Sequence, residues 1–389
     1  MSGTVPVADR ARILLVRTSS LGDVVHALPV LTALRRHLPH ATLGWVVEEP
    51  YAPLLAGHPD LDELIVVRLR RWGARPLAAG TLSGIARFLG DLDRFAPQVV
   101  LDLMGNHKAA VIAALSLAPR RLGHASAGRR EPSSALWLSE RVPVAGTHAV
   151  DRALSLLDGL GLPREPADFG GEKLFRPDPE HGPEEVDAPF VLLHPGAGWG
   201  NKAYPPAWWG EAVRRLHAAT GVRTRVAAAP GEEALAAAVV TAAAISGGSG
   251  SSWGSGSSGG YGGSGGTGGP GGSGGPAAEQ VSAPDLPTLA ALLRRATLML
   301  GGDTGPTHLA HALGTPVLMV MGPTDPERHG PYGAPERAIF RRLPCSFCHQ
   351  RFGEAKACLL EIPPADLAER AAKMLETSLA PLSHGLSSR

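Results

Sequence analysis

The chain has 389 residues, of which 44% are hydrophobic and 19% charged, and its 37 basic and 36 acidic residues leave a formal charge of +1. This composition is typical of a folded globular protein and excludes a chain that is disordered throughout. The balanced charge argues against a protein that coats nucleic acid. The length predicts about two domains. No apolar run reaches the roughly 18 residues of a membrane-spanning helix, and we expect no secretory signal.

Short hydrophobic segments alternate with helical patterns along most of the chain. The predicted strands are Arg12–Arg17, Leu43–Glu48, Glu63–Val67, Gln98–Leu103, Pro189–His194, Arg223–Ala228, Thr297–Gly301 and Pro316–Met321. Amphipathic patterns such as Ala207–Thr220 and Leu286–Arg295 predict helices between them. Strands that alternate with helices in this way predict an α/β fold with parallel sheets.

A stretch rich in Pro, Gly and acidic residues, Pro163–Ala188, divides the chain into two halves. We predict a first domain over residues 1–165, a linker over 166–188, a second domain over 189–365 and a C-terminal helix and tail over 366–389. Residues 246–276 are almost entirely Gly and Ser, which predicts a disordered insertion in the second domain. Two doubly wound domains bind ligands beyond the carboxyl ends of their strands, so the cleft between them is the expected active site.

The loop over residues 18–23, TSSLGD, joins the first predicted strand to the first helix at this ligand edge. Ser20 and Gly22 would let the backbone approach a polar ligand, and Asp23 would face the cleft. The alternative is that Asp23 only caps the helix. The loop does not match the GxGxxG pattern, so it does not indicate a dinucleotide site.

A second loop, GGDTGPTH over residues 301–308, also leads from a strand into a helix. Pro306 is suited to the first helical turn. Asp303, Thr304, Gly305 and His308 surround the predicted helix N-terminus, where backbone N–H groups and the helix dipole favour an anion such as a diphosphate. The alternative is a well-capped helix with a buried histidine.

Two charged residues follow other strands of the second half. Lys202 comes after the loop HPGAG and would place a cation beside the same anion, although a lysine in a loop is usually only solvated. Glu232 lies in the segment PGEE and could bind sugar hydroxyls. The alternative is an ordinary acidic residue at a helix N-terminus.

The first half also contains two groups of arginines. The first group has no acidic residue between Arg68 and Asp91, and its members are Arg68, Arg70, Arg71, Arg75 and Arg87. The second consists of Arg120, Arg121, Arg129 and Arg130. Such groups fit an anionic substrate or an anionic membrane surface, or else form a solvated basic face.

The three cysteines are Cys345, Cys348 and Cys358. An odd, clustered set in a long chain indicates a reducing compartment, so we expect a cytoplasmic protein. The CxxC pair with Cys358 and His349 could form a structural zinc site. Zinc sites of this kind usually combine two such pairs, so we expect no bound metal.

Taken together, these motifs resemble those of the bacterial lipopolysaccharide heptosyltransferases, glycosyltransferase family 9. The resemblance is carried, in this order, by ILLVRTSSLGDVVHALPVLTAL, WVVEE, HPGAGWGNKAYPPAWW, GGDTGPTHLAHALGTPVLMVMGPTDP and HGPYG (His329–Gly333). The segments WVVEE, RRW (Arg70–Trp72) and REP (Arg130–Pro132) are most similar to the heptosyltransferase I branch, which adds the first heptose to Kdo-lipid A.

The resemblance implies a GT-B fold, in which an acceptor domain and a donor domain, both Rossmann-like, face each other across a cleft. It implies ADP-L-glycero-β-D-manno-heptose as donor, inversion at the anomeric carbon, and neither a metal nor another cofactor. The acceptor would be Kdo-lipid A, met by peripheral contact with the cytoplasmic leaflet of the inner membrane. The alternatives are a relative that adds a later heptose or another sugar, and a non-catalytic nucleotide-sugar-binding protein.

The resemblance also assigns roles to individual residues. It implies that Asp23 is the general base. The residues implied to bind the donor are Lys202, Glu232, Asp303, Thr304, Gly305 and His308. Those implied to bind the acceptor are Ser20, Gly22, Arg70, Lys108 and Arg130.

Overall fold

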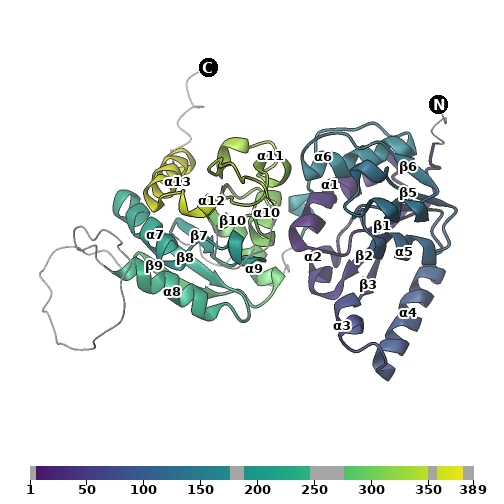
Figure 1. The fold of residues 1–389 in the computed structure, drawn as a ribbon, viewed down its shortest axis with the longest axis horizontal. Helices are drawn as coiled ribbons and strands as arrows, with labels where there is room; N and C mark the ends of the chain where they lie inside the picture. Colours follow the sequence, from purple (N-terminus) through teal and green to yellow (C-terminus); the bar gives the residue numbers. More distant parts are fainter. Residues whose placement is uncertain (1–5, 176–187, 246–275, 349–356, 380–389) are drawn as a thin grey trace, which may run out of the picture.

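The computed structural model describes residues 6–175, 188–245, 276–348 and 357–379. This part of the chain forms two parallel sheets of six strands each, with helices packed on them (Figure 1). The predicted Gly/Ser insertion, apart from Pro276, lies outside the described residues, as does the end of the predicted C-terminal tail. In the described part, no helix is both long and apolar enough to cross a membrane.

The first sheet has the strand order β3-β2-β1-β4-β5-β6, and every neighbouring pair is parallel. Its strands are β1 (Arg12–Val16), β2 (Thr42–Glu48), β3 (Glu63–Val67), β4 (Val99–Asp102), β5 (Arg120–His124) and β6 (Glu140–Val142). The helices of this half are α1 (Leu21–His37), α2 (Ala52–Leu55), α3 (Leu69–Ala74), α4 (Ala79–Phe95), α5 (His107–Leu115) and α6 (Ala149–Leu154).

The second sheet repeats this topology in the order β12-β11-β10-β7-β8-β9. Its strands are β7 (Phe190–His194), β8 (Arg223–Ala228), β9 (Ala278–Ser282), β10 (Leu298–Gly302), β11 (Val317–Val320) and β12 (Ala338–Ile339). The helices are α7 (Pro206–Thr220), α8 (Glu233–Ala244), α9 (Leu286–Arg295), α10 (Gly305–Ala312), α11 (Pro326–His329), α12 (Ala357–Leu360) and α13 (Pro364–Leu379). Both sheets reverse their strand order next to the first strand, as doubly wound domains do, which confirms the predicted architecture.

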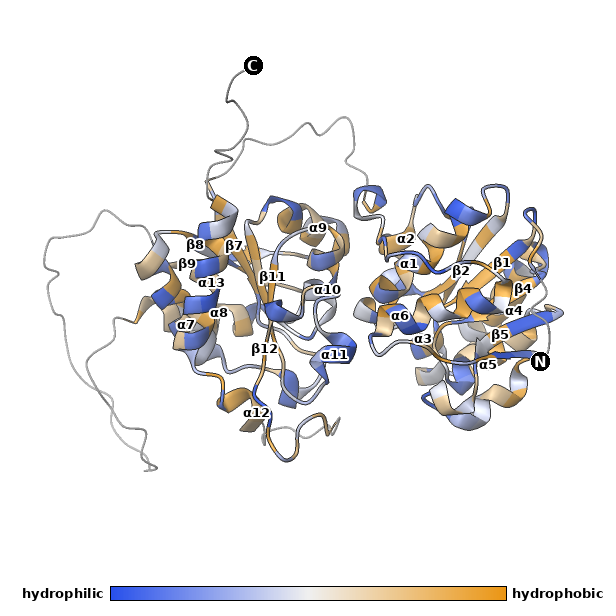
Figure 2. Ribbon diagram, turned by 90° about the horizontal axis from the view of Figure 1, so that it is seen from above, coloured by the Kyte–Doolittle hydropathy of each residue, from blue (hydrophilic) through white to orange (hydrophobic). Residues whose placement is uncertain are grey.

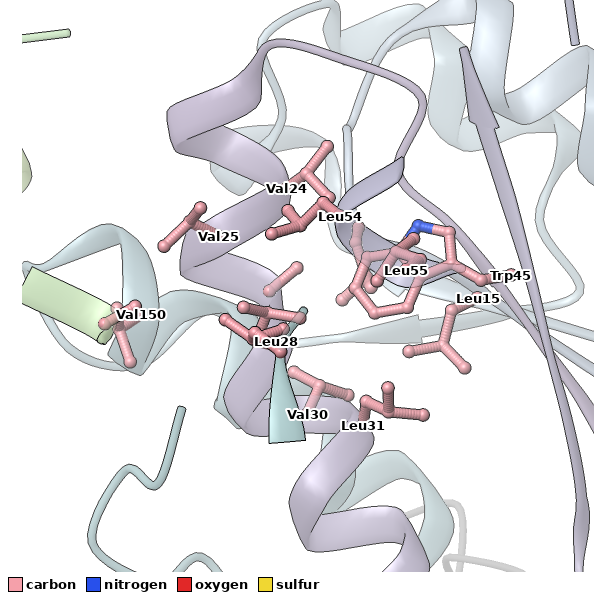
Figure 3. Packing of buried hydrophobic residues seen from close by; sticks show 14 of the residues in the cluster. Leu15, Val24, Val25, Leu28, Val30, Leu31, Trp45, Leu54, Leu55 and Val150 are labelled. Carbon is pink, nitrogen blue, oxygen red and sulfur yellow. The ribbon is translucent and has the colours of Figure 1, made fainter. Parts of the chain in front are cut away.

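Helix α1 is apolar on nearly all sides, which is typical of a helix that is buried all round. Val24 lies on the side of α1 that faces Trp45 of β2, whereas Val25 points away from it (Figure 3). Trp45 is fully buried, and its indole N–H donates to the backbone oxygen of Arg17 at 3.1 Å. The helix therefore packs on its own sheet with one face and has a second apolar face to bury.

That second face meets the other half of the molecule at α10. One continuous group of buried apolar side chains includes Val25 on α1 and both Leu309 and Ala310 on α10. In Figures 1 and 2, α1 and α6 lie opposite α10 and α11. Two hydrogen bonds cross the same junction: His148 Nε2 lies 2.9 Å from the backbone oxygen of Gly330, and the Tyr332 hydroxyl donates to Asp151 at 2.7 Å.

The C-terminal helix α13 packs against α7 of the second domain. Leu367, Ala371 and Leu375 are buried in the same apolar group as Trp209 of α7. The segment that connects β6 of the first sheet to β7 of the second contains Leu174, whose side chain is fully buried.

All eight predicted strands are present, and their ends agree with the prediction to within one residue. Four strands were not predicted: β5, β6, β9 and β12. β6, β9 and β12 lie at sheet edges and have few apolar residues, while β5 begins with two arginines. These strands lack the continuous apolar run on which the prediction depended.

Candidate active site

Asp23 lies in the first turn of α1, at the carboxyl edge of the first sheet. Its Oδ2 accepts hydrogen bonds from the backbone N–H of Ser20 at 3.0 Å and from the Ser20 hydroxyl at 2.8 Å. Its Oδ1 forms an ion pair with Arg17, a residue that the sequence analysis did not select. The bond to the Ser20 backbone closes a capping box in which Ser20 is the N-cap and Asp23 the third helical residue, so Asp23 is not itself the N-cap of α1.

Burial alone would raise the pKa of Asp23. The charge of Arg17 and the hydrogen bonds from Ser20 outweigh this effect and hold the pKa below its ordinary value. The carboxylate is therefore ionised at neutral pH. Its side chain is 34% exposed, so it is accessible to a ligand.

On the other side of the junction, Asp303 follows β10 and binds three donors. Lys202 Nζ lies 2.5 Å from Oδ2, His308 Nε2 lies 2.9 Å from Oδ1, and the Thr324 hydroxyl donates to Oδ2 at 2.6 Å. We call these four residues the Asp303 cluster. Three of them were predicted, whereas Thr324 comes from the loop after β11 and was not.

The Asp303 cluster is nearly closed to solvent, since the Asp303 side chain is 8% exposed and that of Lys202 13%. Burial would raise the pKa of Asp303, but the hydrogen bond from His308 and the charge of Lys202 bring it well below the ordinary value. Lys202 Nζ also lies 4.5 Å from the centre of the Trp199 ring. The lysine is thus held in place by a carboxylate and an aromatic face.

The N-terminal turns of α1 and α10 touch each other, and glycines make this possible. A Cβ atom on Gly22 would lie 2.6 Å from Cδ2 of His308, and one on Gly305 would lie 2.6 Å from Cβ of Leu21. Both distances are too short for real Cβ contacts. The two loops that the sequence analysis selected therefore lie directly against each other across the domain junction.

Helix α10 begins at Gly305, with Thr304 as its N-cap and Pro306 in its first turn. This agrees with the start predicted from Pro306. The helix N-terminus is therefore next to the Asp303 cluster, and its dipole adds partial positive charge there.

A chain of histidines continues from the Asp303 cluster into the first half of the molecule. His26 Nε2 on α1 lies 3.1 Å from Nδ1 of His308, whose Nε2 faces Asp303. Because Nε2 of His308 faces a carboxylate, we assign the proton to that nitrogen, and Nδ1 then accepts from His26. The rings of His148 and His329 lie 5.4 and 6.4 Å from that of His26.

His26, His148 and His329 favour their neutral forms. Burial lowers the pKa of His26 well below its ordinary value and that of His329 to about 4. Neither residue was selected from the sequence as a site residue, although His329 begins the HGPYG segment that carries part of the resemblance. The signal for His26 was a polar side chain within the apolar run of α1, at a position that the helical period places on a buried face.

Glu232 is the N-cap residue of α8, in the loop after β8. Its Oε2 lies 3.1 Å from Nε2 of His194, the last residue of β7. The hydrogen bond from His194 lowers the pKa of Glu232 in spite of its burial. Glu232 thus lies at the same sheet edge as the Asp303 cluster.

The three basic residues predicted to bind the acceptor all lie at the carboxyl edge of the first sheet. Arg70 follows β3, Lys108 follows β4 and Arg130 follows β5, and all three are exposed. Glu131, next to Arg130, donates its backbone N–H to the oxygen of Gly105 in the loop before Lys108. The strand order places the Asp23 loop, which follows β1, between Arg70 on one side and the two other cations on the other.

The second arginine group does not form a basic surface, and that interpretation is wrong for most of its members. Arg129 and Asp102 form an ion pair in which both side chains are fully buried. Arg120 pairs with Glu140 at 2.7 Å, and Arg121 donates to backbone oxygens. Of the four arginines, only Arg130 is exposed. The pairing of β5 with β6, which was not predicted, brings Glu140 beside Arg120.

The cysteines Cys345, Cys348 and Cys358 are free thiols. Within the described ranges, no group of three or more His, Cys, Asp or Glu residues is arranged to hold a metal ion. His349, the fourth ligand considered for zinc, lies outside those ranges.

Residues 85–246 and 281–357, more than half of the chain, match the model of glycosyltransferase family 9 (heptosyltransferase). The chain belongs to glycosyltransferase family 9. This family 9 protein is 30% identical to lipopolysaccharide heptosyltransferase 1 of Pseudomonas aeruginosa over 342 residues, which are 87% of this chain and 86% of the relative. It is 27% identical to the enzyme of the same name from Salmonella typhimurium, over 84% of this chain and 93% of the relative.

Solved structures confirm the GT-B fold that the resemblance implied. The E. coli heptosyltransferase WaaC with ADP superposes with a TM-score of 0.72 at 24% identity, covering 93% of this chain and 99% of WaaC. E. coli ADP-heptose lps heptosyltransferase II superposes with a TM-score of 0.65 at 16% identity, covering 94% of this chain and 99% of its own. This family 9 protein is therefore a glycosyltransferase built from two Rossmann-like domains.

Proposed function

We propose that this glycosyltransferase transfers heptose from ADP-L-glycero-β-D-manno-heptose to Kdo-lipid A, with inversion and without a metal. The observation that carries the proposal is the contact between the Asp23 turn of α1 and the Asp303 cluster at α10. It supports the proposal because the ionised Asp23 carboxylate of one domain then lies close to the N-terminus of α10 in the other, where a diphosphate would bind. The relatives named lipopolysaccharide heptosyltransferase 1 support this choice of sugar and acceptor.

The donor binds to the second domain. Thr304 and Gly305, at the start of α10, and the ammonium of Lys202 interact with the diphosphate. Asp303 and His308 fix the position of Lys202 and of the loop, while Glu232 accepts hydrogen bonds from sugar hydroxyls. As ADP leaves, negative charge develops on the diphosphate, and these groups are already oriented to stabilise it.

The acceptor binds to the first domain. Arg70, Lys108 and Arg130 lie around the Asp23 loop and pair with the acidic groups of the acceptor. Ser20 and Gly22 shape the loop that the reacting sugar approaches. The acceptor hydroxyl attacks the anomeric carbon from the face opposite the leaving ADP, and Asp23 accepts its proton.

A single displacement of this kind inverts the anomeric centre. Because Lys202 and the helix terminus supply the positive charge at the diphosphate, the step does not require a divalent ion. The protein acts in the cytoplasm and meets its lipid acceptor by peripheral contact with the inner membrane.

The test is an assay of the purified chain with ADP-heptose and Kdo-lipid A, with and without EDTA. We expect one heptose to be added per acceptor, measured by mass spectrometry, with equal rates in both samples. The one-bond C–H coupling of the new anomeric centre should show inversion. Transfer from a UDP-sugar but not from ADP-heptose would contradict the proposed donor, and ADP binding without turnover on any acceptor would indicate a binding protein.

A further inference from the structure

The segment that follows β3 is a pair of helices with an unusual surface. Helices α3 and α4, with the loop between them, cover residues 68–95, and we call this segment the α3–α4 hairpin. It lies at the bottom of the first domain in Figure 1, beside β3. Three of its leucines are strongly exposed: Leu77 at 91%, Leu82 at 60% and Leu89 at 38%. Leu82 and Leu89 are seven residues apart on α4 and therefore lie on one face of it.

The exposure of Leu77 is imposed by a fixed loop. The Thr81 hydroxyl donates to the backbone oxygen of Arg75 at 2.6 Å and ties the loop to the first turn of α4. Trp72 of α3 packs on Phe88 of α4 with their ring centres 5.9 Å apart. At Gly84, an added Cβ would lie only 2.9 Å from Nε1 of Trp72, so the two helices are in close contact. The hairpin therefore holds its leucines outward.

The same hairpin carries exposed cations. Arg71, Arg75 and Arg87 are exposed, and none of them forms an ion pair with a described residue. No acidic residue occurs between Arg68 and Asp91. Arg68 itself is paired with Glu49 at 2.7 Å. An apolar tip with unpaired arginines is complementary to a surface that has anionic headgroups above hydrocarbon.

A second exposed apolar group in the same domain lacks these features. It consists of Leu115, Leu117, Leu136 and Trp137. The nearby Arg121 already donates to the backbone oxygen of Trp137. Leu115 is the last residue of α5, Leu117 follows it, and Trp137 lies three residues before β6, so the group lies toward the amino edge of the sheet, opposite the Asp23 loop.

We propose that the α3–α4 hairpin docks this protein on an anionic lipid bilayer, with Leu77 and Leu82 in the interface and the arginines on the headgroups. The inference rests on the proposed function for its biological purpose, because it names the surface that reaches a lipid-borne acceptor. Since α3 begins directly after β3, the hairpin arises from the same sheet edge as the Asp23 loop. Docking there brings that edge to the membrane surface.

The experiment measures binding of the full chain to vesicles that contain neither donor nor acceptor. Vesicles of phosphatidylglycerol and phosphatidylcholine are compared with vesicles of phosphatidylcholine alone, by cosedimentation at low and high salt. The test variants are the double substitutions Leu77→Glu/Leu82→Glu and Arg71→Gln/Arg75→Gln. The matched controls are Leu136→Glu, from the other exposed apolar group, and Arg223→Gln, from the exposed start of β8.

We expect binding to anionic vesicles that weakens with salt. The double leucine variant should bind about 100-fold more weakly, roughly tenfold for each leucine. The double arginine variant should bind about 25-fold more weakly, roughly fivefold for each arginine. Both controls should bind like the parent chain, and all four variants should unfold at the same temperature because the changed side chains are exposed.

Equal loss of binding in Leu136→Glu, or binding that does not respond to either hairpin variant, would overturn the proposal. So would the absence of any difference between the two kinds of vesicle. A turnover assay separates this result from the proposed function: Leu77→Glu/Leu82→Glu should keep its kcat/KM on a soluble, lipid-free Kdo glycoside and lose it on a vesicle-embedded acceptor. Vesicle binding without any turnover would leave the docking surface standing and refute the proposed function.

Discussion

The contact between Gly22 and His308 makes a sharp prediction for Gly22→Ala. The new Cβ would lie 2.6 Å from Cδ2 of His308 and 3.4 Å from its Cγ and Nε2. Carbon atoms in contact normally lie about 3.5–4.0 Å apart, so about 1 Å of movement is required. His308 cannot rotate freely, because its ring is bound by His26 on one side and Asp303 on the other.

The substitution must therefore separate the α1 and α10 turns or break the His308 hydrogen bonds. A displacement of about 1 Å at a reacting centre costs about 100-fold in rate, so we expect kcat/KM for heptose transfer to fall by that order. The added methyl group should also lower the free energy of unfolding by about 1–3 kcal/mol, as overpacked sites do. The assay is the steady-state rate of ADP release with a saturating acceptor, combined with thermal unfolding of the same samples.

Gly90→Ala is the matched control, since Gly90 is an exposed residue of α4 whose added Cβ would meet no atom within 4 Å. It should leave kcat/KM unchanged and raise the unfolding temperature slightly, because Ala is favoured over Gly in a helix by about 1 kcal/mol. A Gly22→Ala enzyme with kcat/KM within twofold of the parent would refute the argument that these two turns must touch for transfer.

Three further predictions concern charge. Arg129→Met should lower the free energy of unfolding by about 3–5 kcal/mol, because it leaves the Asp102 side chain buried without its ion-pair partner. Chemical denaturation measures this change. Arg87→Met, at an exposed arginine, is the control. Lys202→Met should lower kcat by about 10²–10³-fold, and a smaller loss in single-turnover assays would contradict a role at the leaving diphosphate. Burial lowers the pKa of His124, His311 and His329 to about 4, while in the unfolded chain these groups titrate near 6.5. The unfolded state therefore binds more protons between these values, so the unfolding temperature should drop as pH falls from 6.5 to 4; an unchanged temperature would show that these histidines are not buried in neutral form.

The sequence predicted those parts of the fold that depend on local pattern. The apolar runs of β1 and β7 identify central strands, and Pro306 marks the start of α10. The short edge strands β6 and β12 carry little such pattern and were missed. Register and pairing across the sheet are set by packing between distant segments, which a local window does not contain.

The site residues divide in the same way, into those with a local sequence signal and those that depend on distant contacts. Residues in strand-to-helix loops, such as Asp23 and Asp303, were selected because parallel strands bring their carboxyl ends to one edge. Their partners were missed where the contact is distant in the sequence: Thr324 reaches Asp303 from 21 residues away, and His26 reaches His308 from 282 residues away. Arg129 was misinterpreted for the same reason, since its partner Asp102 lies on a different strand.

The central claim is that Asp23 takes the proton of the attacking hydroxyl while the second domain holds the donor. Its most direct test is kcat/KM for transfer by Asp23→Asn, a change that keeps the size of the side chain and removes its basicity. The account predicts a fall of about 10²–10⁴-fold with an unchanged dissociation constant for ADP. A folded Asp23→Asn enzyme that transfers heptose at a rate near that of the parent chain would contradict it.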